Sequence, residues 1–98
     1  MYTKTHPAIS FAEFRALVIP LKGFKSLTGK EYAVLGIQEN EMHFIRKSTN
    51  KKWSMNLESV HHAYLALTDF KTENFRPYVP RTHSPALGLL LHLDLLKR

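Results

Sequence analysis

The stretch from Glu31 to Asn56, EYAVLGIQENEMHFIRKSTNKKWSMN, carries a strand-like hydrophobic period, unlike the helix-like patterns before and after it. A strand-like period of two is found over 31–38, 42–47 and 52–56, and the short polar segments ENE and STNK separate these runs. Alternation with a period of two, interrupted by short polar turns, predicts a three-stranded antiparallel meander. We expect this meander to form the centre of the fold.

The first and last of these runs differ in how many of their two faces are apolar. Over 52–56, Trp53 and Met55 alternate with polar residues, which predicts one face on the core and one in solvent. Over 31–38 both faces are apolar, with Tyr32 and Val34 on one side and Ala33, Leu35 and Ile37 on the other. A strand that is apolar on both faces needs cover on both. This pattern predicts a helix or a second subunit over the second face.

Two helices are predicted to flank the meander. The first, over 11–20, begins with Ser10 and Glu13 at the spacing of a capping box, in which each side chain satisfies a backbone donor of the other. The second begins after Asn56, a favourable N-cap residue, and ends near Asp69. Its apolar stripe at helical spacing consists of Leu57, Val60, Tyr64 and Leu67.

A third helix is predicted over 85–96, after a connector, FKTENFRPYVPRTH, that contains two prolines. Ser84 followed by Pro85 is typical of a helix start, with the hydroxyl at the cap and the ring in the first turn. Leucines occupy most of the circumference, at positions 87, 89, 90, 91, 93, 95 and 96. The helix is therefore expected either at the centre of the fold or in contact with a second copy, which predicts a homodimer.

The composition predicts a single α+β domain over 1–98, with residues 1–9 as a flexible N-terminal segment. An apolar fraction of 44% in 98 residues suffices for one core. The chain contains no cysteine, which excludes disulfides and is compatible with a cytoplasmic location. No secretion signal is recognisable, and the longest apolar run, ALGLLLHLDLL, is too short to span a membrane.

The charge is unevenly distributed, with 14 Lys and Arg against 8 Asp and Glu and a formal net charge of +6. A positive field of this kind attracts polyanions. The most concentrated group lies at the turn of the second hairpin, where cations surround hydroxyl and amide side chains that can donate to phosphate. We expect this tip to contact a phosphate backbone through Arg46, Lys47, Ser48, Thr49, Asn50, Lys51 and Lys52, helped by Arg15, Lys22 and Lys25.

A second candidate anion site lies at the start of the third helix, because the first turn of a helix has free N–H groups and a positive dipole potential. Its residues are Arg76, Arg81, His83 and Ser84. The alternative is that the segment is a stiff connector in which Tyr78 and Val79 pack over the core and Ser84 only caps the helix.

Other sites are not predicted. The segment GFKSLTGKE resembles a phosphate-binding loop, but five residues separate Gly23 from Gly29, and Glu31 replaces the required hydroxyl residue. His61 and His62 are adjacent and point about 100° apart on a helix, so they cannot chelate one metal together. No convergent carboxylates or oriented nucleophile are recognisable. We expect a non-enzymatic protein with no metal and no cofactor.

Two functions remain. The leading prediction is a small basic module that binds DNA or RNA mainly through its phosphates, with slight sequence preference. The alternative is a protein-interaction or scaffold subunit that uses the leucine-rich third helix and the second face of the sheet. The two differ in whether exposed cations or a contiguous apolar patch dominate the surface.

Overall fold

The structure, a computed structural model, describes residues 2–26 and 28–97. Met1, which belongs to the segment expected to be flexible, lies outside this range. The elements in chain order are β1 (Thr3–Lys4), α1 (Phe11–Val18), β2 (Gly23–Lys25), β3 (Glu31–Gln38), β4 (Glu41–Arg46), β5 (Lys51–Asn56), α2 (Leu57–Ala66), the short 3₁₀ helix η1 (Thr72–Phe75), α3 (His83–His92) and β6 (Leu96–Lys97). The chain forms one small α+β domain with antiparallel sheets.

The predicted meander forms three strands of a four-stranded sheet with the order β2-β3-β4-β5. The additional strand β2 pairs with β3 from Gly23 opposite Ala33 to Lys25 opposite Glu31. A strand of three residues is too short to show an alternating pattern, which explains why the sequence did not reveal it. In the connection between β2 and β3, Gly29 adopts a φ of 87°, a conformation that favours glycine.

A β-bulge in β3 corrects the expectation of a strand that is apolar on both faces. Val34 lies opposite Phe44, but Gly36, two residues later, lies opposite His43, so β3 contains one extra residue at this point. The extra residue restores Ile37 to the core side, where it pairs with the buried Met42. The outer face of β3 therefore needs no apolar cover over Ile37, whereas Leu35 remains exposed.

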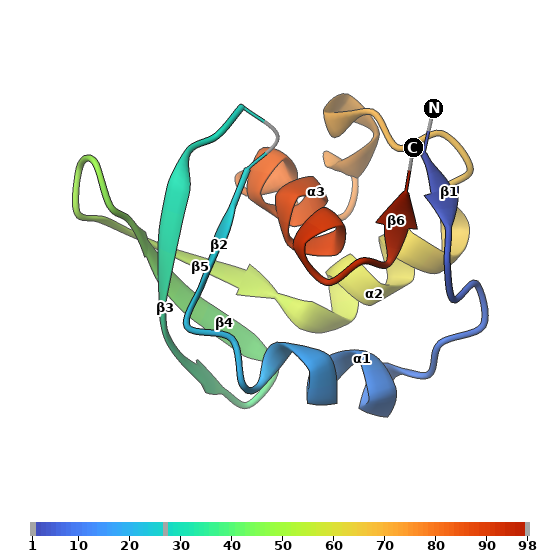
Figure 1. Cartoon of the computed structure of the whole chain (residues 1–98), viewed down its shortest axis with the longest axis horizontal. Helices are drawn as coiled ribbons and strands as arrows, with labels where there is room; N and C mark the ends of the chain where they lie inside the picture. The colour runs from blue at the N-terminus through green and yellow to red at the C-terminus, as the bar shows by residue number, and fades with distance from the viewer. Residues whose placement is uncertain (1, 27, 98) are drawn as a thin grey trace.

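The described helices cover one face of the sheet and leave the other open (Figure 1). Both predicted caps at the start of α1 and α2 are confirmed: Ser10 and Glu13 form the capping box, and the Asn56 side chain accepts from the backbone N–H of Ser59. Helix α2 ends at Ala66, before the expected position near Asp69. The core between sheet and helices contains the aromatic residues Phe14, Phe24, Tyr32, Phe44, Tyr64, Phe70 and Phe75.

Helix α3 lies at the centre of the fold, in agreement with the first of the two expectations for its leucines. Leu87, Leu89 and Leu90 are almost fully buried. Gly88 packs so closely on β2 that a Cβ there would stand 2.7 Å from the Cα of Ser26. The protein's own core thus buries the greater part of this helix, and its leucine content gives no reason for a dimer.

The boundaries predicted for this third helix were wrong at both ends. It begins at His83 with Thr82 as N-cap, and Ser84 lies inside the first turn, so the predicted Ser84 cap is absent. A proline fits anywhere in the first turn, where backbone N–H groups have no helical acceptor, so Pro85 does not determine the start. The helix ends early because Asp94 adopts a positive φ of 58° and the chain then turns back.

The two ends of the chain pair as a small second sheet. Thr3 pairs with Lys97 and Lys4 with Leu96, and Ile9 is buried at 2% exposure. The Tyr64 hydroxyl joins both segments, accepting from the backbone N–H of His6 at 3.2 Å and donating to the Leu95 carbonyl at 2.9 Å. The segment that we expected to be flexible therefore contributes a strand and a core residue.

Candidate nucleic-acid interface and edge groove

Strand pairing brings cations that are distant in sequence to one end of the four-stranded sheet. Lys25 at the end of β2 lies opposite Glu31, and Glu31 lies between Lys25 and Lys47 with ion pairs of 3.7 and 3.9 Å. Lys25, predicted as a helper from a separate segment, thus joins the hairpin tip. Both ion pairs are exposed, so each contributes at most about 1 kcal/mol and leaves the local charge strongly positive.

Lys30 belongs to the same group, although its place in the sequence gave no reason to single it out. Its backbone N–H donates to the Ser26 hydroxyl at 3.1 Å in the β2–β3 turn, immediately before Glu31. We call the cluster at this end of the sheet the basic end. It consists of Lys25, Lys30, Arg46, Lys47, Lys51 and Lys52.

The cations of the basic end divide between the two faces of the sheet. Residues directly opposite one another in a sheet share a face. Lys52 lies opposite Ile45, which in turn lies opposite Ala33, so Lys52 is on the open face. Lys25 and Lys47 share this face through their ion pairs with Glu31. The backbone alternation places Arg46 and Lys51, which pair with each other, on the opposite face. A polyanion could therefore meet cations on either side of the hairpin.

Trp53 provides an aromatic surface beside these cations. It was expected to point toward the core, and its position opposite the buried Phe44 agrees with that face, but the ring is only half-buried. The ammonium of Lys51 stands 4.8 Å from the centre of the indole ring. A cation over an exposed aromatic ring contributes about 0.5–1 kcal/mol. The pair also holds a charge and a stacking surface next to each other.

The turn between β4 and β5 is closed by its own backbone. The N–H groups of Thr49 and Asn50 donate to the Arg46 carbonyl, and Asn50 adopts a positive φ of 54°. The Thr49 hydroxyl accepts from the backbone N–H of Lys51 at 3.3 Å. The predicted tip residues from Lys47 to Lys52 are all exposed, so their side chains are accessible to a ligand.

Arg46 differs from the other tip residues because it is half-buried beside Tyr32, its partner across β3 and β4. Burial raises the pKa of the Tyr32 hydroxyl, and the nearby Arg46 charge and a hydrogen bond with Ser26 oppose that rise. The neutral phenol therefore persists at physiological pH. Arg46 is the least exposed cation of the basic end, and its buried Nε has no hydrogen-bond partner among the described residues.

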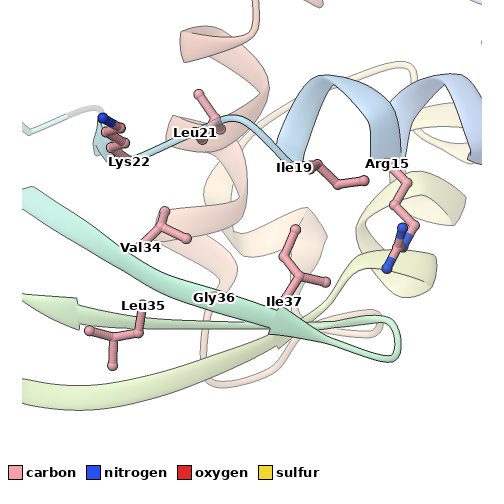
Figure 2. A pocket seen from close by; sticks show the side chains of 8 residues that line it. All are labelled: Arg15, Ile19, Leu21, Lys22, Val34, Leu35, Gly36 and Ile37. Carbon is pink, nitrogen blue, oxygen red and sulfur yellow. The ribbon is translucent and has the colours of Figure 1, made fainter.

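Arg15 and Lys22, also predicted to help the tip, occupy a different place. The Arg15 guanidinium donates to the Glu39 carbonyl at 3.2 Å, in the turn at the other end of β4 from the basic end. Figure 2 shows Arg15 and Lys22 at opposite ends of an open groove. We call this the edge groove. It has a volume of about 390 Å³ and is lined by Arg15, Ile19, Leu21, Lys22, Val34, Leu35, Gly36 and Ile37.

The candidate anion site before α3 is less well assembled. Arg76 and Arg81 are both exposed, and no contact joins them in the described part of the chain. A ring nitrogen of His83 lies 3.1 Å from the Pro80 carbonyl. The connector packs partly into the core through Val79, which is 5% exposed, in agreement with the alternative that it serves as a structural connector.

The histidines of α2 have structural contacts. The His61 ring nitrogen lies 2.8 Å from the Ile9 carbonyl and its ring packs on Phe11 and Phe14, while His62 meets Tyr78 edge-on. Within residues 2–26 and 28–97, no group of three potential metal ligands is found. None of the described helices is long and apolar enough to cross a membrane.

Comparisons with protein-family models, with curated proteins and with solved structures found no match for this chain.

Proposed function

We propose that this protein is a small non-enzymatic module that binds nucleic acid through the basic end of its sheet. The observation that supports the proposal most directly is that one end of the sheet gathers cations from three segments, the end of β2, the β2–β3 turn and the β4–β5 hairpin, and that two of these cations are ion-paired with Glu31. A surface with this density of positive charge attracts a phosphate backbone. Exposed hydroxyl and amide groups at Ser48, Thr49 and Asn50 add neutral donors.

The mode of binding follows from the side chains available. Five of the six cations are lysines, which contact phosphate as point charges and do not read base edges. Arg46 is half-buried, which limits its reach into a groove. Trp53 offers a face on which an unpaired base can stack. The proposed ligand is therefore a single strand of DNA or RNA, bound with slight sequence preference.

A salt titration tests the proposal. Fluorescent single-stranded and duplex oligonucleotides are titrated by anisotropy with the wild type and with the double variant Lys51→Glu, Lys52→Glu. If the basic end neutralises about four phosphates, log affinity falls against log salt with a slope of roughly −3 for a single strand. Loss of two cations should flatten that slope by about 1.5 units.

A matched control separates local contacts from net charge. The variant Lys71→Glu, Lys97→Glu changes the net charge by the same amount at two exposed positions outside the candidate sites, one next to η1 and one in β6. It should retain most of the wild-type affinity, and both variants should keep the wild-type melting temperature. Equal weakening by the two variants, or absence of wild-type binding at about 50 mM salt, would contradict the proposal.

A further inference from the structure

Strand β3 has a free edge over its second half. Its pairing with β2 ends at Ala33, followed by one backbone hydrogen bond from the N–H of Val34 to the Lys22 carbonyl at 2.9 Å. Before Lys22 the chain leaves the sheet toward α1 through Pro20, which has no N–H to donate. Over Leu35–Gln38, β3 thus has β4 on one side and, among the described strands, none on the other.

The surroundings of this free edge are apolar and open. Ile19 and Leu35 are 55% and 56% exposed, more than any other large hydrophobic residue in the described part of the chain. A Cβ placed on Gly36 would meet no atom within 4 Å, so space remains directly beside the strand. Protected edges usually carry charged side chains or a covering loop. Between Val34 and Ile37 the edge carries no charged side chain of its own, and an open groove separates it from the segment that carries Ile19, Leu21 and Lys22.

The charges around the groove favour one kind of occupant. Arg15 and Lys22 lie at its two ends, with Ile19 and Leu21 between them (Figure 2), and no carboxylate side chain lines it. An extended chain with apolar residues in the middle and acidic residues at both ends would match this order. A second copy of the protein fits poorly, because two apposed edge grooves would bring the same cations together.

We propose that the edge groove binds an extended acidic and apolar segment of a partner protein, which adds to β3 as a fifth strand alongside Leu35–Gln38. Main-chain hydrogen bonds to the free edge would provide affinity, and alternate side chains would contact Ile19 and Leu35. The free edge of four residues spans about 14 Å, so the paired part of the partner is short. This site is separate from the basic end, and its occupation does not require nucleic acid.

A synthetic peptide provides the probe: a fluorescein-labelled nonamer with alternating valine and threonine in the middle and two aspartates at each end. Anisotropy should show saturable binding to the wild-type protein. Lys22→Glu should weaken binding by about tenfold, the effect of reversing one cation at the rim of an interface. Leu35→Asp should weaken binding at least as much, since it removes an apolar contact and adds a repelling charge.

Two matched peptides test the geometry. Replacing the aspartates by lysines should abolish binding if charge order matters. Methylating the valine and threonine amides should abolish it if main-chain pairing is required, because the donors on both edges of the peptide are lost while the side chains remain. In the ¹⁵N-labelled wild-type protein, the changes in amide chemical shift on peptide binding should concentrate at residues 35–38. This measurement uses the wild-type protein alone, so it does not depend on the folding of any variant.

The proposal fails if the wild type does not bind the peptide at millimolar concentration, or if amide shifts are confined to the basic end. It also fails if light scattering shows a concentration-dependent dimer that Leu35→Asp abolishes, because a second copy then occupies the groove. The variant Lys51→Glu, Lys52→Glu should bind the peptide no more weakly than the wild type. Loss of peptide binding in that variant would show that the two sites are not separate.

Discussion

Gly88 of α3 and Lys25 of β2 are in direct backbone contact: a Cβ on Gly88 would collide with the Lys25 carbonyl oxygen. The helix can approach the strand this closely only because residue 88 has no side chain. The contact places the central helix directly behind one lysine of the basic end, so the packing of the core and the position of the cations depend on each other.

Gly88→Ala is therefore expected to destabilise the protein by about 1–3 kcal/mol, although alanine is the better helix former, because the helix must move away from the backbone of β2. Thermal or urea unfolding followed by circular dichroism measures the change. An unchanged or raised melting temperature would show that the contact is looser than described. The variant should also show amide shifts at Lys25 and Ser26 before any loss of folding.

Removing the Asn56 side chain is expected to destabilise the protein more than removing the Ser84 hydroxyl. Asn56→Ala should cost about 1 kcal/mol, because the Asn56 side chain accepts from the N–H of Ser59 at 3.0 Å. Ser84→Ala should change stability by less than about 0.5 kcal/mol, since Ser84 is not the N-cap of α3. Urea unfolding of both variants in parallel gives the comparison. A larger effect at Ser84 would restore the cap expected from the Ser-Pro pattern.

Tyr64→Phe is expected to loosen the two chain ends. The hydroxyl accepts from the N–H of His6 and donates to the carbonyl of Leu95. Its loss leaves the His6 N–H without this acceptor, at a cost of about 1–2 kcal/mol. Hydrogen exchange should accelerate at Thr3–Lys4 and Leu96–Lys97 before it does in the four-stranded sheet. Uniform acceleration throughout the chain would show that the small sheet unfolds only together with the core.

The capping box at α1 predicts an acid-dependent contribution to stability. Hydrogen bonds that the backbone N–H and the side chain of Ser10 donate to the carboxylate lower the pKa of Glu13 below its usual 4.5. A lowered pKa in the folded state means that the stabilisation is present above pH 4.5 and disappears as the pH falls through the folded-state value. The melting temperature of Glu13→Gln should lie below that of the wild type at neutral pH and converge with it under acidic conditions. A constant difference across this range would contradict the linkage.

Trp53 is predicted to affect single strands more than duplexes. If one base stacks on the indole, Trp53→Ala should weaken single-strand binding by roughly tenfold while leaving the salt slope unchanged, because a stacking contact contributes about 1–3 kcal/mol and releases no counterion. Trp53→Phe should retain most of the affinity. Anisotropy titrations with matched single-stranded and duplex oligonucleotides measure the two affinities. Equal losses of affinity for single strands and duplexes would show that no base stacks on Trp53.

The amino-acid sequence by itself determined the local elements. Periodicity identified β3, β4 and β5, and cap chemistry located the starts of α1 at Ser10 and α2 at Asn56, because such signals depend on residues within one or two turns. It also singled out the hairpin tip from Arg46 to Lys52 as a concentration of cations. All of these features arise from neighbours in the chain, where sequence spacing approximates distance.

The tertiary structure alone decided the features that depend on distant partners. Strand β2 exists because β3 provides its hydrogen bonds, and the pairing of β1 with β6 depends on residues 3–4 and 96–97 meeting in space. The bulge in β3 returned Ile37 to the core and left Leu35 exposed, a one-residue shift that no alternating pattern reveals. Strand pairing places Lys25 beside the hairpin tip, and the β2–β3 turn contributes Lys30 to the basic end. Arg15 and Lys22, predicted to help the tip, line the edge groove instead. Strand register brings distant residues to one surface, whereas sequence order specifies only local neighbours.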